Sequence, residues 1–281
     1  MRKVLLGIVG LMFFALPATA QTADEIVAKY IKTIGGMEKI QAIKTVRLTE
    51  KFTGGGGFEA AIIGENKRPN KTREEFSLQG MIGVTVYDGK DGWKIEPWQG
   101  KKDVESLSDE EMKAMIDGAD FDDSLINYKA RNIKVEYVGM DTVDGTDAFK
   151  LKVTLPSGTT KYYFMDTDYY VPIKIETKRT IRGAEVESET IIGDYKEVGG
   201  VYFPHSFESG AKGSPNKVTV TIEKMELNVP IDDSRFARPM IKTQTQPGGK
   251  IEEDKDIPKT PEKKNEPDKS KPPTGVKKPV S

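Results

Sequence analysis

The sequence predicts a mainly β protein, an incomplete antiparallel β-barrel of about eleven or twelve strands with an N-terminal helix and a helical lid. Short apolar segments separated by Gly, Asp and Pro turns run through residues 45–227. Helical spacing is confined to one segment near the N-terminus and one in the middle of the chain. No repeat with a period of about 20 to 50 residues is evident, which disfavours a propeller or a solenoid.

Residues 1–20 resemble a secretory signal peptide. Arg2 and Lys3 precede an apolar run over 4–16, and small residues at 18–20 suit a signal peptidase. We therefore expect the mature chain to begin at Gln21. An uncleaved anchor is the alternative, but the run is shorter than the roughly 20 residues that a membrane-spanning helix needs.

Residues 21–240 are expected to form one domain, and residues 241–281 a disordered tail. The tail alternates Lys, Glu, Asp and Pro and has almost no large apolar side chain. Such a segment cannot bury enough apolar surface to offset its chain entropy. Its expected role is solubility or spacing, and a docking role is the alternative.

Composition excludes several functions. The 43 basic and 44 acidic residues nearly balance, so we expect no nucleic-acid partner, which would favour a basic excess. The chain has no cysteine and therefore no disulfide, no thiolate nucleophile and no cysteine metal site. An exported fold of this kind depends on its hydrophobic core alone.

The predicted domain begins with helices and continues as a meander. Thr22 and Glu25 are spaced as a capping box, and an apolar stripe follows until Gly35 and Gly36 end the helix. A short second helix is expected at 37–43. Turn residues then separate a series of expected strands at 45–52, 58–66, 72–78, 81–87 and 93–98.

An amphipathic helix interrupts the strands. Ser108 and Glu111 form a second predicted capping box, and Met112, Met115 and Ile116 follow at helical spacing. Strands then resume, at 133–138, 148–155, 160–165, 170–178, 186–195, 201–208 and 217–227.

The sequence offers little support for catalysis. His205 is the only histidine, and its place after Pro204 at the start of a strand favours a structural role. The acidic pairs 122–123, 166 and 168, and 232–233 lie in turn-like stretches, where Asx hydrogen bonds explain them. We expect no enzyme activity, no cofactor and no metal. An exported hydrolase that uses Asp166 and Asp168 is the rival interpretation.

A curved sheet with one apolar face and a methionine-bearing lid can enclose a cavity for flexible acyl chains, because methionine adapts to irregular apolar shapes. Periodicity alone favours the alternative, an ordinary packed core. The candidate cavity and lid residues are Phe76, Leu78, Val84, Val86, Trp93, Met112, Met115 and Ile116.

Three motifs resemble the LolA-type periplasmic lipoprotein carriers. They are "KRPN" at 67–70, "YDGKDGWKIEP" at 87–97 and "PIDDSRFARP" at 230–239. The order of elements agrees over about residues 22–240, although the chain is longer than those carriers and its lysine-rich tail has no counterpart. The resemblance implies an incomplete barrel whose lidded cavity takes lipoprotein acyl chains from an inner-membrane releasing complex to an outer-membrane acceptor.

The resemblance also implies a role for one residue and a cellular compartment. In that family the arginine of the basic-Arg-Pro corner hydrogen-bonds to the lid and holds it closed, and by motif position this residue is Arg68. Lys67, Lys71 and Arg73 around it are expected to be solvated. We expect a periplasmic monomer, with acylated lipoproteins or lipids as partners. The alternative is an envelope sensor or scaffold of the same fold.

Overall fold

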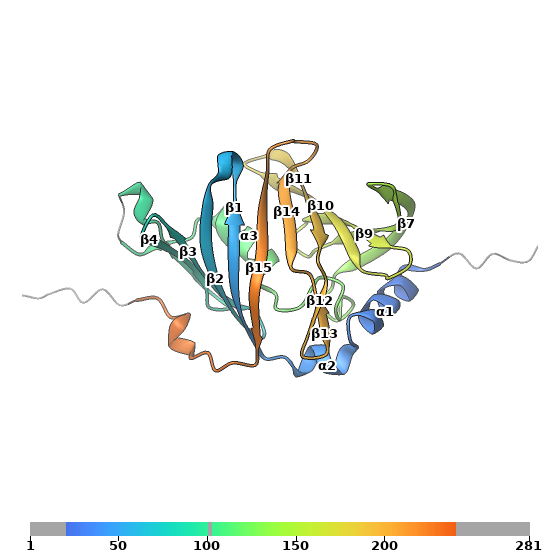
Figure 1. The fold of residues 1–281 in the computed structure, drawn as a ribbon, viewed down its shortest axis with the longest axis horizontal. Helices are drawn as coiled ribbons and strands as arrows, with labels where there is room; N and C mark the ends of the chain where they lie inside the picture. The colour runs from blue at the N-terminus through green and yellow to red at the C-terminus, as the bar shows by residue number, and fades with distance from the viewer. Residues whose placement is uncertain (1–20, 101–102, 240–281) are drawn as a thin grey trace, which may run out of the picture. The chain divides into compact units, whose positions relative to one another are not determined.

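The computed structural model describes residues 21–100 and 103–239. The predicted signal peptide and the predicted tail lie outside these residues. Within them, one antiparallel sheet of 13 strands dominates, in the order β6-β5-β4-β3-β2-β1-β15-β14-β11-β10-β9-β8-β7 (Figure 1). The sheet does not close, because β6 and β7 form its two edges. The predicted incomplete antiparallel barrel is therefore confirmed.

The strands of this sheet are β1 (Thr45–Thr53), β2 (Glu59–Lys67), β3 (Lys71–Leu78), β4 (Met81–Tyr87), β5 (Gly92–Ile95), β6 (Glu105–Ser106), β7 (Lys134–Val143), β8 (Thr146–Thr154), β9 (Thr160–Asp166), β10 (Pro172–Ile181), β11 (Ala184–Gly193), β14 (Ser206–Ala211) and β15 (Lys217–Leu227). A second sheet pairs β12 (Lys196–Val198) with β13 (Val201–Phe203). We call β1–β6 the N-terminal half of the main sheet, and β7–β11 with β14 and β15 the C-terminal half.

Three α-helices and three short 3-10 helices complete the described chain: α1 (Ala23–Thr33), α2 (Met37–Ala42), α3 (Asp109–Ala119), η1 (Gly55–Gly57), η2 (Pro97–Gln99) and η3 (Asp233–Arg235). Both predicted capping boxes are present, at Thr22 with Glu25 and at Ser108 with Glu111. No helix in the described part of the chain is long and apolar enough to cross a bilayer.

Two predicted strands end earlier than expected because of proline. The strand expected at 93–98 stops at Ile95, and Pro97 begins η2. The strand expected at 201–208 is divided at Pro204 into β13 and β14, which belong to different sheets. Proline lacks the N–H that a sheet ladder requires, so a strand does not continue through it.

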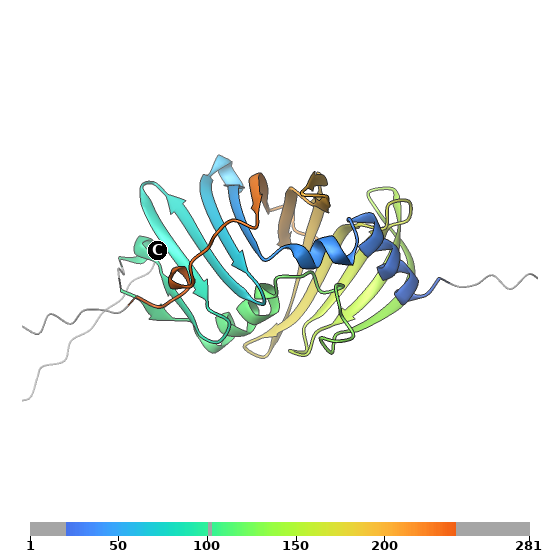
Figure 2. The same ribbon diagram turned by 90° about the horizontal axis from the view of Figure 1, so that it is seen from below.

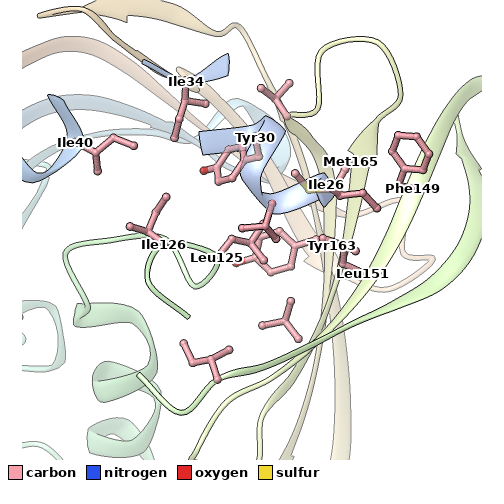
Figure 3. Close-up of a cluster of buried hydrophobic side chains, with 14 of the residues drawn as sticks. Ile26, Tyr30, Ile34, Ile40, Leu125, Ile126, Phe149, Leu151, Tyr163 and Met165 are labelled. Atoms are coloured by element: carbon pink, nitrogen blue, oxygen red, sulfur yellow. The ribbon is translucent and has the colours of Figure 1, made fainter. Parts of the chain in front are cut away.

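The main core covers one face of the C-terminal half, where α1, α2 and the segment after α3 pack against β7–β10 (Figures 2 and 3). Ile26, Leu125, Leu151 and Met165 are fully buried there. The Tyr163 hydroxyl donates to Asp123 Oδ2 at 2.9 Å, and this hydrogen bond connects β9 to the loop that follows α3. Burial of large aliphatic and aromatic side chains is the dominant stabilising contribution in a chain without disulfides.

Candidate functional site

The two faces of the N-terminal half are set by strand pairing, because residues directly opposite each other project to the same side of a sheet. Val46 pairs with Asn66 and then Thr72, and Val46 belongs to the main core. We call this the inner face. The neighbouring set, which runs from Arg47 through Glu65 to Arg73, lies on the opposite, outer face.

The outer face is covered by residues 229–238, which we call the C-terminal strap. Ile231 and Phe236 of the strap are buried in a cluster with Val86 and Trp93. The indole Nε1 of Trp93 donates to the carbonyl of Phe236 at 3.2 Å. An apolar cover therefore protects this side of β4 and β5.

Charged contacts attach the same strap to β2 and β3. Asp233 lies 2.9 Å from Lys67 and 3.1 Å from Lys71. Arg235 bonds to Glu65 at 2.8 Å, and Glu65 is almost completely buried. The expectation that Lys67, Lys71 and Arg73 are solvated is therefore wrong, because all three contact the strap, Arg73 by donating to the carbonyl of Arg235 at 3.3 Å.

Arg68 projects to the other side of the corner between β2 and β3. Its guanidinium donates to both carboxylate oxygens of Asp122, at 2.5 and 2.6 Å. It also donates to the carbonyls of Ile40 at 2.9 Å and Ile43 at 2.6 Å, at the end of α2. The ring of Phe121 lies against it, with 4.4 Å between Cζ and the ring centroid. Arg68 thus joins α2 to the loop that follows α3, and its hydrogen bonds go to these two segments and not to α3 itself.

The helix α3 lies beside the inner face of the N-terminal half, and its start fits against a glycine of the "DGW" motif. A Cβ at Gly92 would lie 2.5 Å from Leu107 and 2.7 Å from the Met112 sulfur. Any larger residue at 92 would therefore require the side chains of Leu107 and Met112 to shift. Among the α3 residues only Ala119 is buried.

Three cavities surround α3. The Met112 cavity, of about 560 Å³, lies between the helix and the β8–β9 turn. Ile116 and Leu155 contribute to its apolar surface, and charged residues such as Asp120 and Arg131 also line it. The Arg179 cavity, of about 270 Å³, faces the ends of β9 and β10. The Lys94 cavity, of about 450 Å³, faces β3–β5. Ligand pockets commonly measure about 300–1,000 Å³, so the Met112 cavity is large enough for a small molecule or an acyl chain.

A fourth, central cavity of about 250 Å³ lies next to Arg68. It is lined by residues of α1 and α2, by Phe121, and by the apolar side chains of Ile175 and Ile192 on the sheet. Arg68 and Asp122 stand at its edge. The corner that the "KRPN" motif marks therefore touches a cavity as well as the end of α2.

Two glutamates give the inner face of the N-terminal half an acidic character. Glu50 on β1 pairs with Ile62, and Glu74 on β3 pairs with Gly64, so both project inward. Burial and the neighbouring charge of Glu74 raise the pKa of Glu50 from 4.5 to about 7. Burial also raises the pKa of Glu74. This part of the inner face is less apolar than the sequence predicted.

Polar contacts also attach α3 to its neighbours. Lys94 Nζ bonds to Glu111 at 2.6 Å, and this hydrogen bond, with the backbone N–H of Ser108, lowers the pKa of Glu111 to about 2. Asp117 accepts hydrogen bonds from Ser157 at 2.9 Å and from Thr159 at 2.6 Å. The helix is therefore connected to β5 and to the β8–β9 turn through groups that water can replace.

The predicted site residues fall into separate groups. Met112 and Ile116 line the Met112 cavity, and Met115 lines the Lys94 cavity. Phe76 lies on the inner face, where its ring contacts Phe52 and Trp98 edge to face. Leu78 follows Phe76 two residues later on β3, so it projects to the same inner face, and it is half-buried.

Val84, Val86 and Trp93 lie elsewhere. They belong to the outer face under the C-terminal strap, where the register pairs Val86 with Trp93. Strand alternation correctly separates the two faces, but it does not say which of them is turned inward. The outer face is the one that the apolar side chains of the strap cover. Phe236 of the strap follows Trp93 by 143 residues, so no local sequence pattern indicates this contact.

Sequence reasoning did not identify Asp117 or Asp122 as site residues. Asp122 was interpreted as a turn residue with Asp123, and only Asp123 behaves so, accepting from the backbone N–H of Leu125. The predicted Asx hydrogen bonds are also present at Asp166 and Asp232. No three His, Asp or Glu side chains of the described residues cluster closely enough to hold a metal ion.

No protein-family model and no curated protein matches the sequence. A LolA superfamily protein from Nitrosomonas europaea matches the structure with a TM-score of 0.53 at 14% identity, over 78% of this chain and 99% of that one. An outer membrane lipoprotein-sorting protein domain from Vibrio parahaemolyticus matches with a TM-score of 0.51 at 12% identity, over 76% and 97%.

A DUF1329 family protein from Desulfovibrio piger matches equally well, with a TM-score of 0.53 at 11% identity, over 78% of this chain and 98% of that one. The architecture is thus an incomplete β-barrel with a helix beside its inner face. This fold is similar to that of the LolA superfamily protein and of the lipoprotein-sorting domain, so the resemblance that the sequence motifs predict is confirmed at the level of the fold.

Proposed function

We propose that this protein is a periplasmic, non-enzymatic carrier that binds the acyl chains of lipoproteins, or of related lipids, and moves them toward the outer membrane. The observation that carries the proposal is α3: it buries only Ala119, and Met112 and Ile116 line an apolar cavity of about 560 Å³ beside it. An acyl chain gains roughly 0.8 kcal/mol for each buried methylene, so even a partly filled cavity binds lipid usefully.

The proposed partners follow from this role. An inner-membrane complex would release the acylated lipoprotein to the carrier, and an outer-membrane acceptor would receive it. We propose that the carrier works as a monomer, since transfer requires the cavity to be reachable from both partners in turn. Weak polar contacts around α3 are compatible with uptake and release, because a lid must exchange between two states of similar free energy.

Mass spectrometry of lipids and acylated peptides that copurify with the mature protein from the cell envelope tests binding. Ile116→Lys places a charge in the Met112 cavity, and we expect it to lower bound lipid about tenfold, a loss of 1.4 kcal/mol. Ile116 is already half exposed, so the fold should tolerate the change. Ile82→Lys is the matched control, since Ile82 is similarly exposed and lines none of the four cavities described above.

A transfer assay separates a carrier from a sensor. The loaded protein is incubated with outer-membrane vesicles, and a carrier delivers its acylated peptide to them. An envelope sensor or scaffold would bind the peptide without delivering it. A protein that carries no lipid or acylated peptide, and whose Ile116→Lys variant behaves as the parent, would end the binding proposal altogether.

A further inference from the structure

The three cavities around α3 are neighbours. The Met112 and Arg179 cavities share Lys113 and Asp117 in their linings. The Arg179 and Lys94 cavities share Glu111 and Ala114. They therefore lie side by side around the helix, each against a different face of it, and are separated only at particular side chains.

Two polar contacts lie at these boundaries. The first joins Asp117 to Ser157, in the lining of the Met112 cavity, and to Thr159, in the lining of the Arg179 cavity. The second joins Glu111 to Lys94, where the Arg179 and Lys94 cavities meet. Each contact thus stands between two cavities and attaches α3 to the sheet.

The middle of α3 is held more loosely than its surroundings. At its start Leu107 is buried, and the Leu107 N–H donates to the carbonyl of Gly92. After its end Leu125 and Ile126 are buried in the main core. Between these ends every α3 side chain except Ala119 is half-buried or exposed, and its contacts with the sheet include hydrogen bonds that water can replace at little cost.

We propose that the three cavities are sections of one ligand groove, and that Asp117 and Glu111 are its gate residues. Uptake breaks both contacts and lets the middle of α3 move away from the sheet, while Arg68 keeps the loop after α3 in place. The proposal rests on the proposed function, because it says where around α3 the ligand lies.

The linings of the groove also give the ligand an orientation. The Met112 section is mainly apolar, with Met112, Ile116 and Leu155, so it takes the acyl chain. The Lys94 section carries Thr72, Thr85 and Lys94 together with the carboxylates of Glu74, Glu96 and Glu111, so it takes the polar group of the same molecule. The ligand class is therefore an elongated amphiphile with one apolar and one polar end.

A reversible cross-link tests the gate. The natural sequence has no cysteine, so the reagent reacts only with the two cysteines that are introduced. Asp117→Cys with Ser157→Cys is joined by a short, reducible bis-methanethiosulfonate reagent. Binding of hexadecanoic acid with a terminal fluorophore is followed by stopped flow. We expect the cross-link to slow uptake at least tenfold and reduction to restore it. Lys51→Cys with Glu59→Cys, cross-linked between two strands away from α3, is the matched control.

A second variant keeps the test decisive if the linked protein folds poorly. Ser157→Ala with Thr159→Val removes both donors without changing α3, and near-ultraviolet circular dichroism checks its fold. We expect faster uptake of the same probe. A parent protein that does not bind the probe contradicts the proposed function. A parent that binds it, with uptake unchanged by the cross-link or by the double variant, overturns the gate alone.

Discussion

The C-terminal half of the sheet has its inner face covered by α1, α2 and the loop after α3, whereas the N-terminal half has its outer face covered by the C-terminal strap. The first arrangement fills the space inside the curve with buried side chains such as Leu125 and Tyr163. In the N-terminal half, the inner face is instead occupied by α3 and its cavities. One continuous sheet therefore contains a rigid half and an open half.

The difference shows how a fold of this kind can keep a cavity and remain stable. In the open half the apolar surface that stabilises the strands faces outward, against Ile231 and Phe236 of the strap. The inner face is thereby relieved of part of its packing role and can hold polar groups such as Glu74 and Lys94 beside the aromatic contacts of Phe76. Stability and ligand binding are placed on opposite faces of the same strands.

The stretch at 67–76 connects the two arrangements. Lys67 and Lys71 contact Asp233 of the strap on one side, and Arg68 contacts Asp122 on the other. A corner that looks like a solvated turn in the sequence is thus attached to both covers of the sheet.

The largest expected effect is a core substitution in the rigid half. Leu125 is fully buried, and Leu125→Ala should lower the free energy of unfolding by about 2–5 kcal/mol, because it leaves a cavity that the packed surroundings cannot fill. Urea denaturation measures the loss. Met115→Ala in the open half should cost less than about 1 kcal/mol, since Met115 lies beside an existing cavity. Equal costs for the two variants would contradict the division into halves.

A smaller loss is expected at the corner. Arg68→Leu leaves Asp122 and the carbonyls of Ile40 and Ile43 without their donor, which should cost about 1–3 kcal/mol while the fold persists. We also expect this variant to impair cargo uptake or release. Arg68→Lys keeps the charge but not the planar fork, so it should recover only part of the stability. Wild-type stability and transfer in Arg68→Leu would reduce the stretch to a turn.

The sequence was sufficient for most of the fold. Capping boxes at Thr22 and Ser108, and turn residues between alternating strands, gave the order and type of the elements because these signals are local. Local signals failed where proline ended a strand early, as at Pro204, and where β13 joined a separate sheet.

The candidate site was less predictable because its residues meet across long sequence distances. Met112, Met115 and Ile116 were identified from helical spacing, and Arg68 from a motif. Asp122, its partner, follows 54 residues later with no pattern that pairs the two. Contacts of this kind depend on the register of the whole sheet, which a single sequence does not specify.

The inner face of the open half should make stability depend on pH. The pKa of Glu50 in the folded protein is about 7, above its ordinary 4.5, so folding favours the protonated form. This contribution is complete below about pH 4.5 and is lost as the pH rises through about 7. Allowing for solvent on this face, we expect Glu50→Gln to stabilise the protein at pH 8 by about 1 kcal/mol and to have little effect at pH 4. Thermal unfolding at both pH values measures it, and an equal effect at both would exclude this origin.

The smallest effect concerns the contact between α3 and β5, and it has the opposite dependence on pH. The hydrogen bond from Lys94 and the backbone N–H of Ser108 hold the pKa of Glu111 at about 2, below its ordinary 4.5. The stabilisation is therefore present above about pH 4.5 and is lost as the pH falls toward 2. Glu111 is partly exposed, so Glu111→Gln should cost only about 0.5 kcal/mol.

Hydrogen exchange of the α3 amides between pH 5 and pH 3 is the appropriate measurement, because global unfolding hardly registers so small a contribution. After correction for intrinsic exchange rates, protection of α3 should fall with pH in the parent and be low and constant in Glu111→Gln. Glu136→Gln is the matched control, since Lys134 lowers the pKa of Glu136 on the edge strand β7, away from α3. If both variants changed α3 protection equally, the contact between Glu111 and Lys94 would have no specific part in holding the helix. Other groups would then hold α3 against the open half.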